Sequence, residues 1–499
     1  MTTVLVHLDQ LTRDHGALAG VAPGEVRVLM VRNLSMLRSR PWHVQKLHLL
    51  LTAAEHFAAD LRAEGFEVAL VDAPTLQVAL AEHRRRHGAA EPIRSARPSS
   101  HAQVALLERL GVVQVDHTMF LTSAAEFTAW ADGVRTLRME PFYRRQRLRL
   151  GILVEGGQPV GGTWNLDAEN RLPPPRSRYQ WPTVLTDPLD EVDARVADWI
   201  SRAGLTTWGE PPDGTWARTR TGARARLAHF IAEVLPGFGP YEDAMPADSW
   251  SVHHSLLSPY LNLGLLHPRE VVDAALQRHA EQPVPLSSLE GFIRQIIGWR
   301  EYVHGAYWWL GPEYRHRNDL GARASLPLLF TDPSRTDMAC MASVIGDVRE
   351  RGWAHHIPRL MLMANLALIA GVDPAALLGW MRAAFIDAYD WVMVPNVIGM
   401  GVHADSATMM TKPYAAGGAY IDRMGRWCRG CRYNPRLRSG DEACPFTTLY
   451  WDFLDRNAEA LAGNHRMTRQ VSARTRLADL PAVRTRAPAV VAGLVDGRV

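Results

Sequence analysis

The four cysteines of the chain are the residues whose spacing most clearly points to chemistry. Cys428 and Cys431 form a Cys-x-x-Cys pair, Cys444 follows shortly after, and Cys340 lies far upstream. In a cytoplasmic chain such clustering favours a metal or cluster site over disulfide bonds. Four thiolates suit tetrahedral zinc or a 4Fe-4S cluster. The spacing does not decide between these two, and cysteines without any ligand are the third alternative. Cys444-Pro445 is similar to the Cys-Pro that closes many cluster sites.

A second group lies in His355-His356-Ile357-Pro358-Arg359, at the expected start of a helix. His356 and Arg359 are three residues apart, so both side chains can point from one helix face at a single ligand. The arginine would then be a fixed cation and the histidine a proton donor. A purely structural role is the alternative for such a pair of histidines.

Residues 254–260, His-Ser-Leu-Leu-Ser-Pro-Tyr, place hydroxyl groups and backbone donors at another expected helix start. Exposed N–H groups and the helix dipole favour phosphate there, although a plain N-cap explains Ser255 equally well. The same half of the chain is dense in aromatic residues, namely Trp299, Tyr302, Trp308, Trp309, Trp353, Trp380, Tyr389 and Trp391. Such residues ordinarily form a core, and one-electron transfer through a helical domain would also need them.

Residues 1–130 should form an α/β unit that supports these groups. Short β-rich runs alternate there with helical patterns, at residues 4–8, 26–31, 43–61, 66–71, 76–86, 104–110 and 112–115. Strands that alternate with helices at this spacing predict a parallel sheet covered on both faces. No Gly-x-Gly-x-x-Gly follows the first strand, which argues against a Rossmann-type dinucleotide site.

Residues 131–218 are expected to connect this unit to a second one. Between positions 151 and 212 the chain is rich in Gly and Pro, and neither helical nor strand periodicity persists. The stretch 158–171 is too specific in composition for a bland linker. It could pack against both units.

Residues 219–465 show helical patterns and should form a large all-α domain. Ser287 and Glu290 have the spacing of a capping box ahead of an apolar helix face. A later helix should end at Gly371, and Asp373-Pro374 should begin the next one, which is expected to reach about Tyr389.

The formal net charge of +3 on 499 residues does not by itself mark a nucleic-acid binder. Positive charge is concentrated, however: residues 135–149 contain six arginines against Glu140 alone, and residues 466–499 contain seven against Asp479 and Asp496. We expect this basic tail to be solvated and frayed. No apolar run approaches the roughly 18 residues of a membrane span and no signal peptide begins the chain, so a soluble cytoplasmic protein is expected.

Together these pieces resemble the photolyase and cryptochrome family along nearly the whole chain. The flavin domain of that family contains Ser-x-Leu-Ser-Pro-Tyr, Trp-Arg-Glu and Trp-x-x-(Asn or His)-x-x-Arg. Here these motifs stand in order at 255–260, 299–301 and 353–359. The iron-sulfur branch, which contains bacterial cryptochromes and prokaryotic (6-4) photolyases, is the most similar. It also resembles this chain at residues 290–302, 395–400 and 411–415 and at all four cysteines.

The resemblance implies an N-terminal antenna domain and a helical domain that holds FAD and a 4Fe-4S cluster. The residues implied to line the flavin are Tyr241, His254, Ser255, Leu256, Leu257, Ser258, Gln295, Trp299, Arg300, Tyr302, His356, Arg359, Asp387, Asn396, Gly399 and Met400. Among these, Ser255 to Ser258 would hold the diphosphate. Electron transfer is implied for Trp380 and Tyr389, and cluster ligation for Cys340, Cys428, Cys431 and Cys444.

The function that the resemblance implies is light-driven repair of pyrimidine-pyrimidone (6-4) photoproducts by electron transfer from reduced FAD. His356 would donate a proton to the lesion, with His355 and Tyr414 as further catalytic candidates. Lys412 and Tyr414 would meet the flipped bases of UV-damaged DNA. The protein is expected to act as a monomer without membrane contact.

Three positions depart from the family pattern. Leu360 follows Arg359 where the animal (6-4) enzymes have a second histidine, so a two-histidine mechanism of that form is not available. Met393 stands where relatives have an acidic residue near the flavin ring, and Met381 stands where they have a tyrosine. Flavin redox tuning and photoreduction are therefore expected to differ.

The antenna chromophore of close relatives is 6,7-dimethyl-8-ribityllumazine, and its binding pattern is poorly matched at residues 33–42 and 97–102. Two other functions stay open, a blue-light-sensing cryptochrome without repair and a cyclobutane dimer photolyase. A zinc-stapled DNA-binding protein without flavin would explain the cysteines and arginines. It would not explain the motifs at 299–301 and 355–359.

Overall fold

The N-terminal unit is built on a five-stranded parallel sheet with the strand order β4-β2-β1-β5-β6. The computed structural model describes residues 1–499. The strands of this sheet are β1 (Thr2–Val6), β2 (Val26–Asn33), β4 (Glu67–Ala73), β5 (Ile93–Ala96) and β6 (Val113–Val115). Two short pairs lie apart from it, β3 (Trp42–His43) with β9 (Thr207–Trp208) and β7 (Val154–Glu155) with β8 (Gln158–Pro159). The predicted parallel sheet is confirmed.

The helices of the N-terminal half cover this sheet and continue into the connector. They are α1 (Leu34–Leu37), α2 (Val44–Ala63), α3 (Leu76–His87), α4 (His101–Arg109), α5 (Ala124–Asp132), α6 (Met139–Leu150), α7 (Glu191–Arg202) and α8 (Arg220–His229). β5 is the one strand of the sheet that the sequence reading missed. Its four residues, which follow Pro92, are too few to give a periodic signal.

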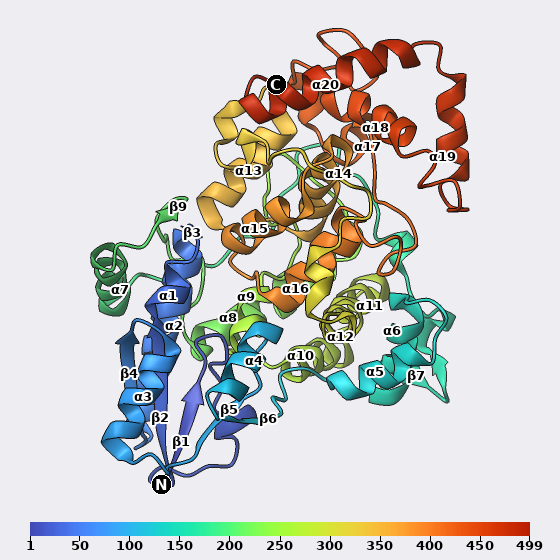
Figure 1. The fold of residues 1–499 in the computed structure, drawn as a ribbon. Helices are drawn as coiled ribbons and strands as arrows, with labels where there is room; N and C mark the ends of the chain where they lie inside the picture. Colours follow the sequence, from blue (N-terminus) through green and yellow to red (C-terminus); the bar gives the residue numbers. More distant parts are fainter.

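The second half of the chain is helical, and in Figure 1 it fills the centre and top of the view. Its helices are α9 (Ser258–Leu263), α10 (Pro268–Glu281), α11 (Leu286–Ile293), α12 (Glu301–Leu310), α13 (Ala339–Arg351), α14 (Asn365–Ala370), α15 (Pro374–Ala384), α16 (Asp390–Val394), α17 (Gly418–Met424), α18 (Pro445–Arg456), α19 (Thr468–Ala473) and α20 (Leu480–Asp496). Segments 294–300, 358–364 and 395–401 are π-helical. None of the helices combines the length and apolarity that a membrane span requires.

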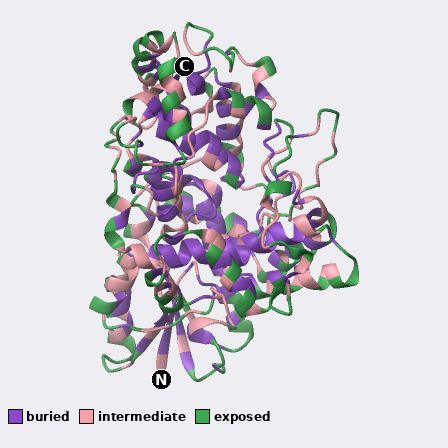
Figure 2. Ribbon diagram, turned by 90° about the vertical axis from the view of Figure 1, so that its right-hand side faces the viewer, coloured by how far each residue is buried: buried purple, intermediate pink, exposed green.

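Burial on the sheet follows the alternation of strand side chains. Val4 and Val28 belong to the core on the face that α2 covers, whereas Leu5 and Leu29 pack with α3 and α4 on the other face. The first of these cores continues into the helical domain, where it includes Tyr260. Figure 2 shows the same continuity as a band of buried residues through the middle of the molecule. The two units are therefore packed against each other.

The helix signals near Gly371 are confirmed, but the end of the following helix is not. Gly371 terminates α14 with a left-handed φ of 72°, and the Asp373 carboxylate caps α15 by accepting from the Ala375 N–H at 2.9 Å. α15 ends at Ala384 rather than near Tyr389.

The predicted capping box at Ser287 and Glu290 is wrong. The N-cap of α11 is Pro285, two residues before Ser287, and it makes no side-chain cap; the helix begins at Leu286. The Glu290 carboxylate instead accepts from the Tyr143 hydroxyl at 2.8 Å and the Leu166 N–H at 2.9 Å. A tertiary contact has replaced the local one.

The prediction of a frayed C-terminal tail is also wrong. Residues 466–499 contain α19 and α20, and α20 buries Val483, Ala487, Val490 and Leu494 to 5% exposure or less. This i, i+4, i+7, i+11 spacing is an apolar helix stripe, which the surrounding arginines hid in the composition. Two of those arginines, Arg474 and Arg484, pair with Asp455.

Candidate functional site

Three histidines from two distant segments meet in the helical domain. The rings of His254 and His355 stack with their centroids 4.3 Å apart, and His356 meets His254 edge-on at 5.4 Å. Burial, and then the neighbouring histidines, lower the pKa of His254 and that of His355 well below the ordinary value, so both rings are neutral. His356 is 46% exposed, and its Nε2 lies 3.6 Å from Asp243 Oδ1. His356 is therefore the ring best placed to carry a proton.

A bidentate ion pair lies beside this cluster. Arg359 Nη1 and Nη2 donate to Asp387 Oδ1 and Oδ2 at 2.8 and 3.1 Å. The Ser258 hydroxyl donates to Asp387 Oδ2 at 2.7 Å. Burial alone would raise the pKa of Asp387, but Arg359 and the hydrogen bonds hold it below its ordinary value. The structure thus brings together Ser258, Arg359 and Asp387, three of the predicted site residues.

Glu242 and Asp243, which the sequence reading missed, complete the polar surroundings. Glu242 Oε1 accepts from Gln295 Nε2 at 2.6 Å, and Oε2 accepts from Asn170 Nδ2 at 3.0 Å. Burial raises the pKa of Glu242 to about 7, against the opposing charge of Arg294. The available signal was an acidic pair directly after Tyr241. Its importance depends on burial, which the sequence does not show.

The loop before α9 is strained. Val252 and Leu256 adopt left-handed backbone conformations, with φ of 50° and 57°. Such conformations in residues other than glycine cost of order 1 kcal/mol or more and cluster at ligand sites. Ser255 Oγ accepts from the Leu257 N–H at 3.4 Å, while Leu257 itself is buried.

Several predicted flavin residues lie elsewhere. Arg300 Nη1 donates to Met119 O at 3.0 Å, and its guanidinium lies 4.0 Å from the Phe120 ring, so it faces the N-terminal unit. Tyr302 is buried in an aromatic cluster with Phe127 and Trp299. Tyr241 lies against Tyr179, Trp181 and His253. Motif position alone did not decide the direction of these side chains.

The remaining predicted residues lie in helices or directly before one. Trp380 is buried between Phe330 and Phe385, with ring centroids 4.9 and 5.8 Å away. Tyr389 is partly buried, and the Lys46 ammonium lies 5.7 Å from its ring. A Cβ at Gly399 would stand 2.4 Å from the Tyr314 hydroxyl, so only glycine fits there. Met400 and Asn396, in the same π-helical segment, are half-buried.

The connector loop, residues 158–171, packs against the helical domain near Tyr414. This is one of the two contacts predicted for it. Arg294 Nη1 lies 3.2 Å from Asp167 Oδ1, and Asn170 Nδ2 donates to Ser287 O at 3.1 Å. Burial raises the pKa of Tyr414, with Asp167 as the next cause. Tyr414 and Lys412 are both half-buried.

The six arginines of residues 135–149 do not form one surface. Arg147 is 1% exposed, and its guanidinium donates to the carbonyls of Ile152 and Trp164 at 3.3 and 2.7 Å. It cannot reach a phosphate. Arg144 and Arg145 instead line a shallow surface hollow of about 740 Å³ on α6.

The four cysteines line one small cavity of about 10 Å³. Cys340 lies in the first turn of α13, Cys428 and Cys431 flank a tight turn, and Cys444 is the N-cap of α18. Burial is the largest cause that raises the pKa of three of these thiols, and with Asp422 it raises that of Cys428 to about 12. Thiolates there need a bound cation, which is the chemistry of a metal or cluster site.

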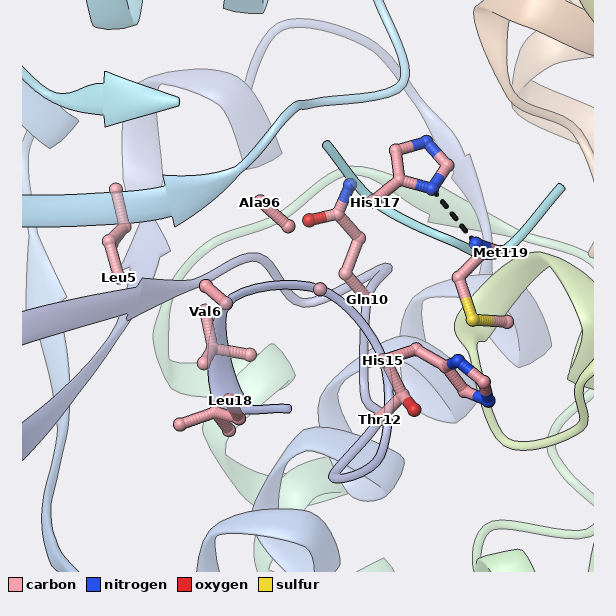
Figure 3. Close-up of a pocket in the computed structure, with 11 residues that line it drawn as sticks. Leu5, Val6, Gln10, Thr12, His15, Leu18, Ala96, His117 and Met119 are labelled. Atoms are coloured by element: carbon pink, nitrogen blue, oxygen red, sulfur yellow. Dashed lines mark hydrogen bonds between the residues drawn. The ribbon is translucent and has the colours of Figure 1, made fainter. Parts of the chain in front are cut away.

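A second small cavity, of about 20 Å³, lies at the carboxyl ends of β1 and β5. Figure 3 shows Val6, Ala96, His15 and His117 around it. A chromophore site in a protein usually offers several hundred Å³. In the segment 33–42, Trp42 is buried with its Nε1 donating to Leu37 O at 2.7 Å. The lumazine antenna therefore stays a prediction.

Comparison with known proteins shows the family of the chain. It is 40% identical over 489 residues to a (6-4) photolyase of Agrobacterium fabrum (strain C58), a match that covers 95% of this chain and 96% of that protein. The chain belongs to the photolyase and cryptochrome family. A family model described as deoxyribodipyrimidine photo-lyase-related protein matches residues 4–216, in the α/β and connector part.

Solved structures of the photolyase and cryptochrome family share the fold. A bacterial class III photolyase from Agrobacterium tumefaciens aligns with a TM-score of 0.57 at 17% identity, covering 99% of this chain and 98% of that one. A cryptochrome from Synechocystis sp. PCC6803 aligns with a TM-score of 0.54 at 14% identity, covering 81% and 83%. The α/β unit followed by a helical domain is thus the fold of this family, and membership supports a flavin cofactor.

Proposed function

We propose that this protein repairs pyrimidine-pyrimidone (6-4) photoproducts in UV-damaged DNA by light-driven electron transfer from reduced FAD. The observation that carries the proposal is the half-exposed His356 facing Asp243, next to the Arg359 and Asp387 ion pair. It stands in a chain that is 40% identical to a (6-4) photolyase across almost its whole length.

The residues around the histidine cluster fit a large polar cofactor. His355 Nδ1 and Trp353 Nε1 are buried without a hydrogen-bond partner, which costs free energy unless a ligand satisfies them. Arg359, Asp387 and Gln295 would hold the flavin, and the strained Ser255 loop would hold the diphosphate. Light-driven donation of one electron is the chemistry that FAD supplies when bound.

The chain itself must handle a proton. Reversing a (6-4) bond moves an oxygen from one base back to the other and therefore requires an acid beside the lesion. The Asp243 carboxylate, whose Oδ1 lies 3.6 Å from His356 Nε2, would orient that ring. The neutral His254 and His355 would hold that ring in place. Leu360 offers no second acid.

We also propose that the four cysteines hold a 4Fe-4S cluster rather than zinc. Cys340, Cys428, Cys431 and Cys444 would be its ligands, and the apolar shell of Trp427 and Phe446 supports it by excluding water. Trp380 and Tyr389 would serve electron transfer toward the flavin.

Repair should be specific for the (6-4) lesion and should require light. Purified protein with reduced flavin is expected to convert a (6-4) photoproduct in a synthetic duplex to intact pyrimidines under blue light, and to leave it unchanged in the dark. Chromatography of the digested duplex measures the product. A duplex with a cyclobutane dimer serves as the comparison. Repair of the dimer alone would reassign the substrate, and repair of neither would favour the sensor function that Met381 and Met393 also allow.

DNA should bind partly through the exposed arginines of α6. Arg144→Ala is expected to reduce the slope of log affinity against log salt concentration by about 1, the amount for one lost phosphate contact. The reason is that each neutralised phosphate releases counterions. Anisotropy titrations of a lesion duplex between roughly 50 and 200 mM salt measure the slope. Arg85→Ala, on the exposed surface of α3, is the matched control. An unchanged slope in Arg144→Ala would remove α6 from the DNA interface.

A further inference from the structure

The C-terminal helix α20 connects the two parts of the chain that supply the cysteines. Its buried stripe packs against α18, which begins directly after Cys444. Its far end reaches the segment that leads into α13, the helix of Cys340, since a Cβ at Gly497 would lie 3.0 Å from Arg335 Cβ. Figure 1 shows α20 beside both α18 and α13 at the top of the molecule.

Arg486 of α20 binds the backbone next to a cysteine. Its Nη2 donates to the carbonyl oxygen of Ala443 at 2.9 Å, and its Nη1 donates to the Thr448 hydroxyl. Thr448 in turn donates to Arg438 O at 2.8 Å. The guanidinium therefore fixes both ends of the segment that carries Cys444, and it lies close enough to act electrostatically on the thiol.

A second contact fixes the same segment from the start of α20. Arg438 Nε lies 2.9 Å from Asp479 Oδ2, and Asp479 is the residue that precedes the helix. Both partners are about one third exposed, so this pair is weaker than the Arg486 contacts. The two anchors, Asp479 and Arg486, are seven residues apart in sequence and hold α20 against this segment.

We propose that residues 479–499 form a clamp that retains the metal of the four-cysteine site, with Arg486 as its positioning residue. Metal leaves such a site when one ligand segment moves away, because the remaining thiolates bind far more weakly. Arg486 prevents this movement at Cys444 and adds a positive charge near the thiolates. The inference rests on the proposed cluster for the identity of the metal, whereas the clamp needs only that the cysteines bind one.

The test compares metal loss from full-length variants. Wild-type protein, Arg486→Ala, Arg486→Lys and Arg498→Ala are purified without oxygen, and iron, zinc, sulfide and flavin are measured per chain. Each is then mixed with an iron and zinc chelator, and metal release is followed by absorbance. Arg486→Ala should release metal roughly tenfold faster or more than wild type, as expected for a lost charged hydrogen bond. Arg486→Lys should release metal at a rate between those of wild type and Arg486→Ala, because lysine keeps the charge but cannot make both hydrogen bonds of the guanidinium.

Arg498→Ala is the matched control, because Arg498 is an exposed arginine of the same tail whose side chain pairs with Asp496 and not with a cysteine segment. It should release metal at the wild-type rate. Equal rates in Arg486→Ala and Arg498→Ala, with full flavin content in both, would overturn the clamp. Should Arg486→Ala fail to fold, Arg438→Ala must show a smaller acceleration, or the clamp is likewise rejected. Zinc in the wild-type protein would refute the proposed cluster while still allowing the clamp to be judged.

Discussion

Replacing His356 with alanine is expected to lower repair of (6-4) photoproducts by a factor of about a hundred or more, the usual scale for a general acid. The substitution removes the one half-exposed ring of the histidine cluster and leaves the Arg359 and Asp387 ion pair untouched. Flavin content, metal content and affinity for lesion DNA should therefore stay as in wild type. Repair yield per absorbed photon measures the effect.

The wild-type protein should also lose repair as the pH rises, since only an imidazolium can give up a proton to the lesion. The sign is fixed by the acid role: the active form is the protonated one, so activity falls with increasing pH. In His356→Ala that dependence should disappear. His316→Ala, at an exposed histidine outside the cluster, should behave as wild type in yield and in pH profile.

His355→Ala separates the two neighbouring histidines. His355 is buried and neutral, so its loss should disturb the stacking with His254 and the flavin environment more than proton transfer. We expect a shifted flavin spectrum with a wild-type pH dependence. A pH-independent repair in His355→Ala together with normal repair in His356→Ala would move the acid to His355.

Replacing Cys431 with serine is the second substitution with a large expected effect. Loss of one of four thiolates should abolish binding of the cluster, and the protein should become insoluble or be purified without iron, compared with about four irons per chain in wild type. Because a bound metal would tie α13 to the segments of Cys428 and Cys444, its binding free energy would be part of the folding free energy. Iron analysis and the broad absorbance of the cluster measure the result.

Arg429→Ser controls for a change in the same turn that keeps all four thiols, since Arg429 lies exposed between Cys428 and Cys431. It should keep full iron and solubility. A soluble Cys431→Ser protein that still carries about four irons would remove Cys431 from the ligand set.

Most of the fold could be predicted from the sequence. Alternating β-rich and helical runs predicted the parallel sheet, because strands that alternate with helices at this spacing form a parallel sheet with helices on its faces. Each miss has its own cause. β5 was too short for a periodic signal, Glu290 exchanged a local cap for Tyr143, and the apolar stripe of α20 was hidden among arginines.

The candidate site could be predicted only in part from the sequence. A motif shows which residue types occur together, but it does not show which way each side chain points. Arg300 lies in the same motif as Trp299, yet its guanidinium turns toward Phe120 in the other unit. Asp243, which faces His356, lies more than a hundred positions upstream of it and belongs to no motif that we recognised.

What the sequence by itself determined was the chemistry available: four thiols with metal spacing, a histidine pair ahead of an arginine, and a helical domain after an α/β unit. These are properties of residue type and local order, and local order fixes hydrophobic period and chelating distance. Only the tertiary structure decided which histidine is exposed, which arginines are internal, and that the C-terminal helix packs against α18 beside Cys444. Burial and long-range contact depend on packing between segments far apart in the chain, which no local pattern encodes.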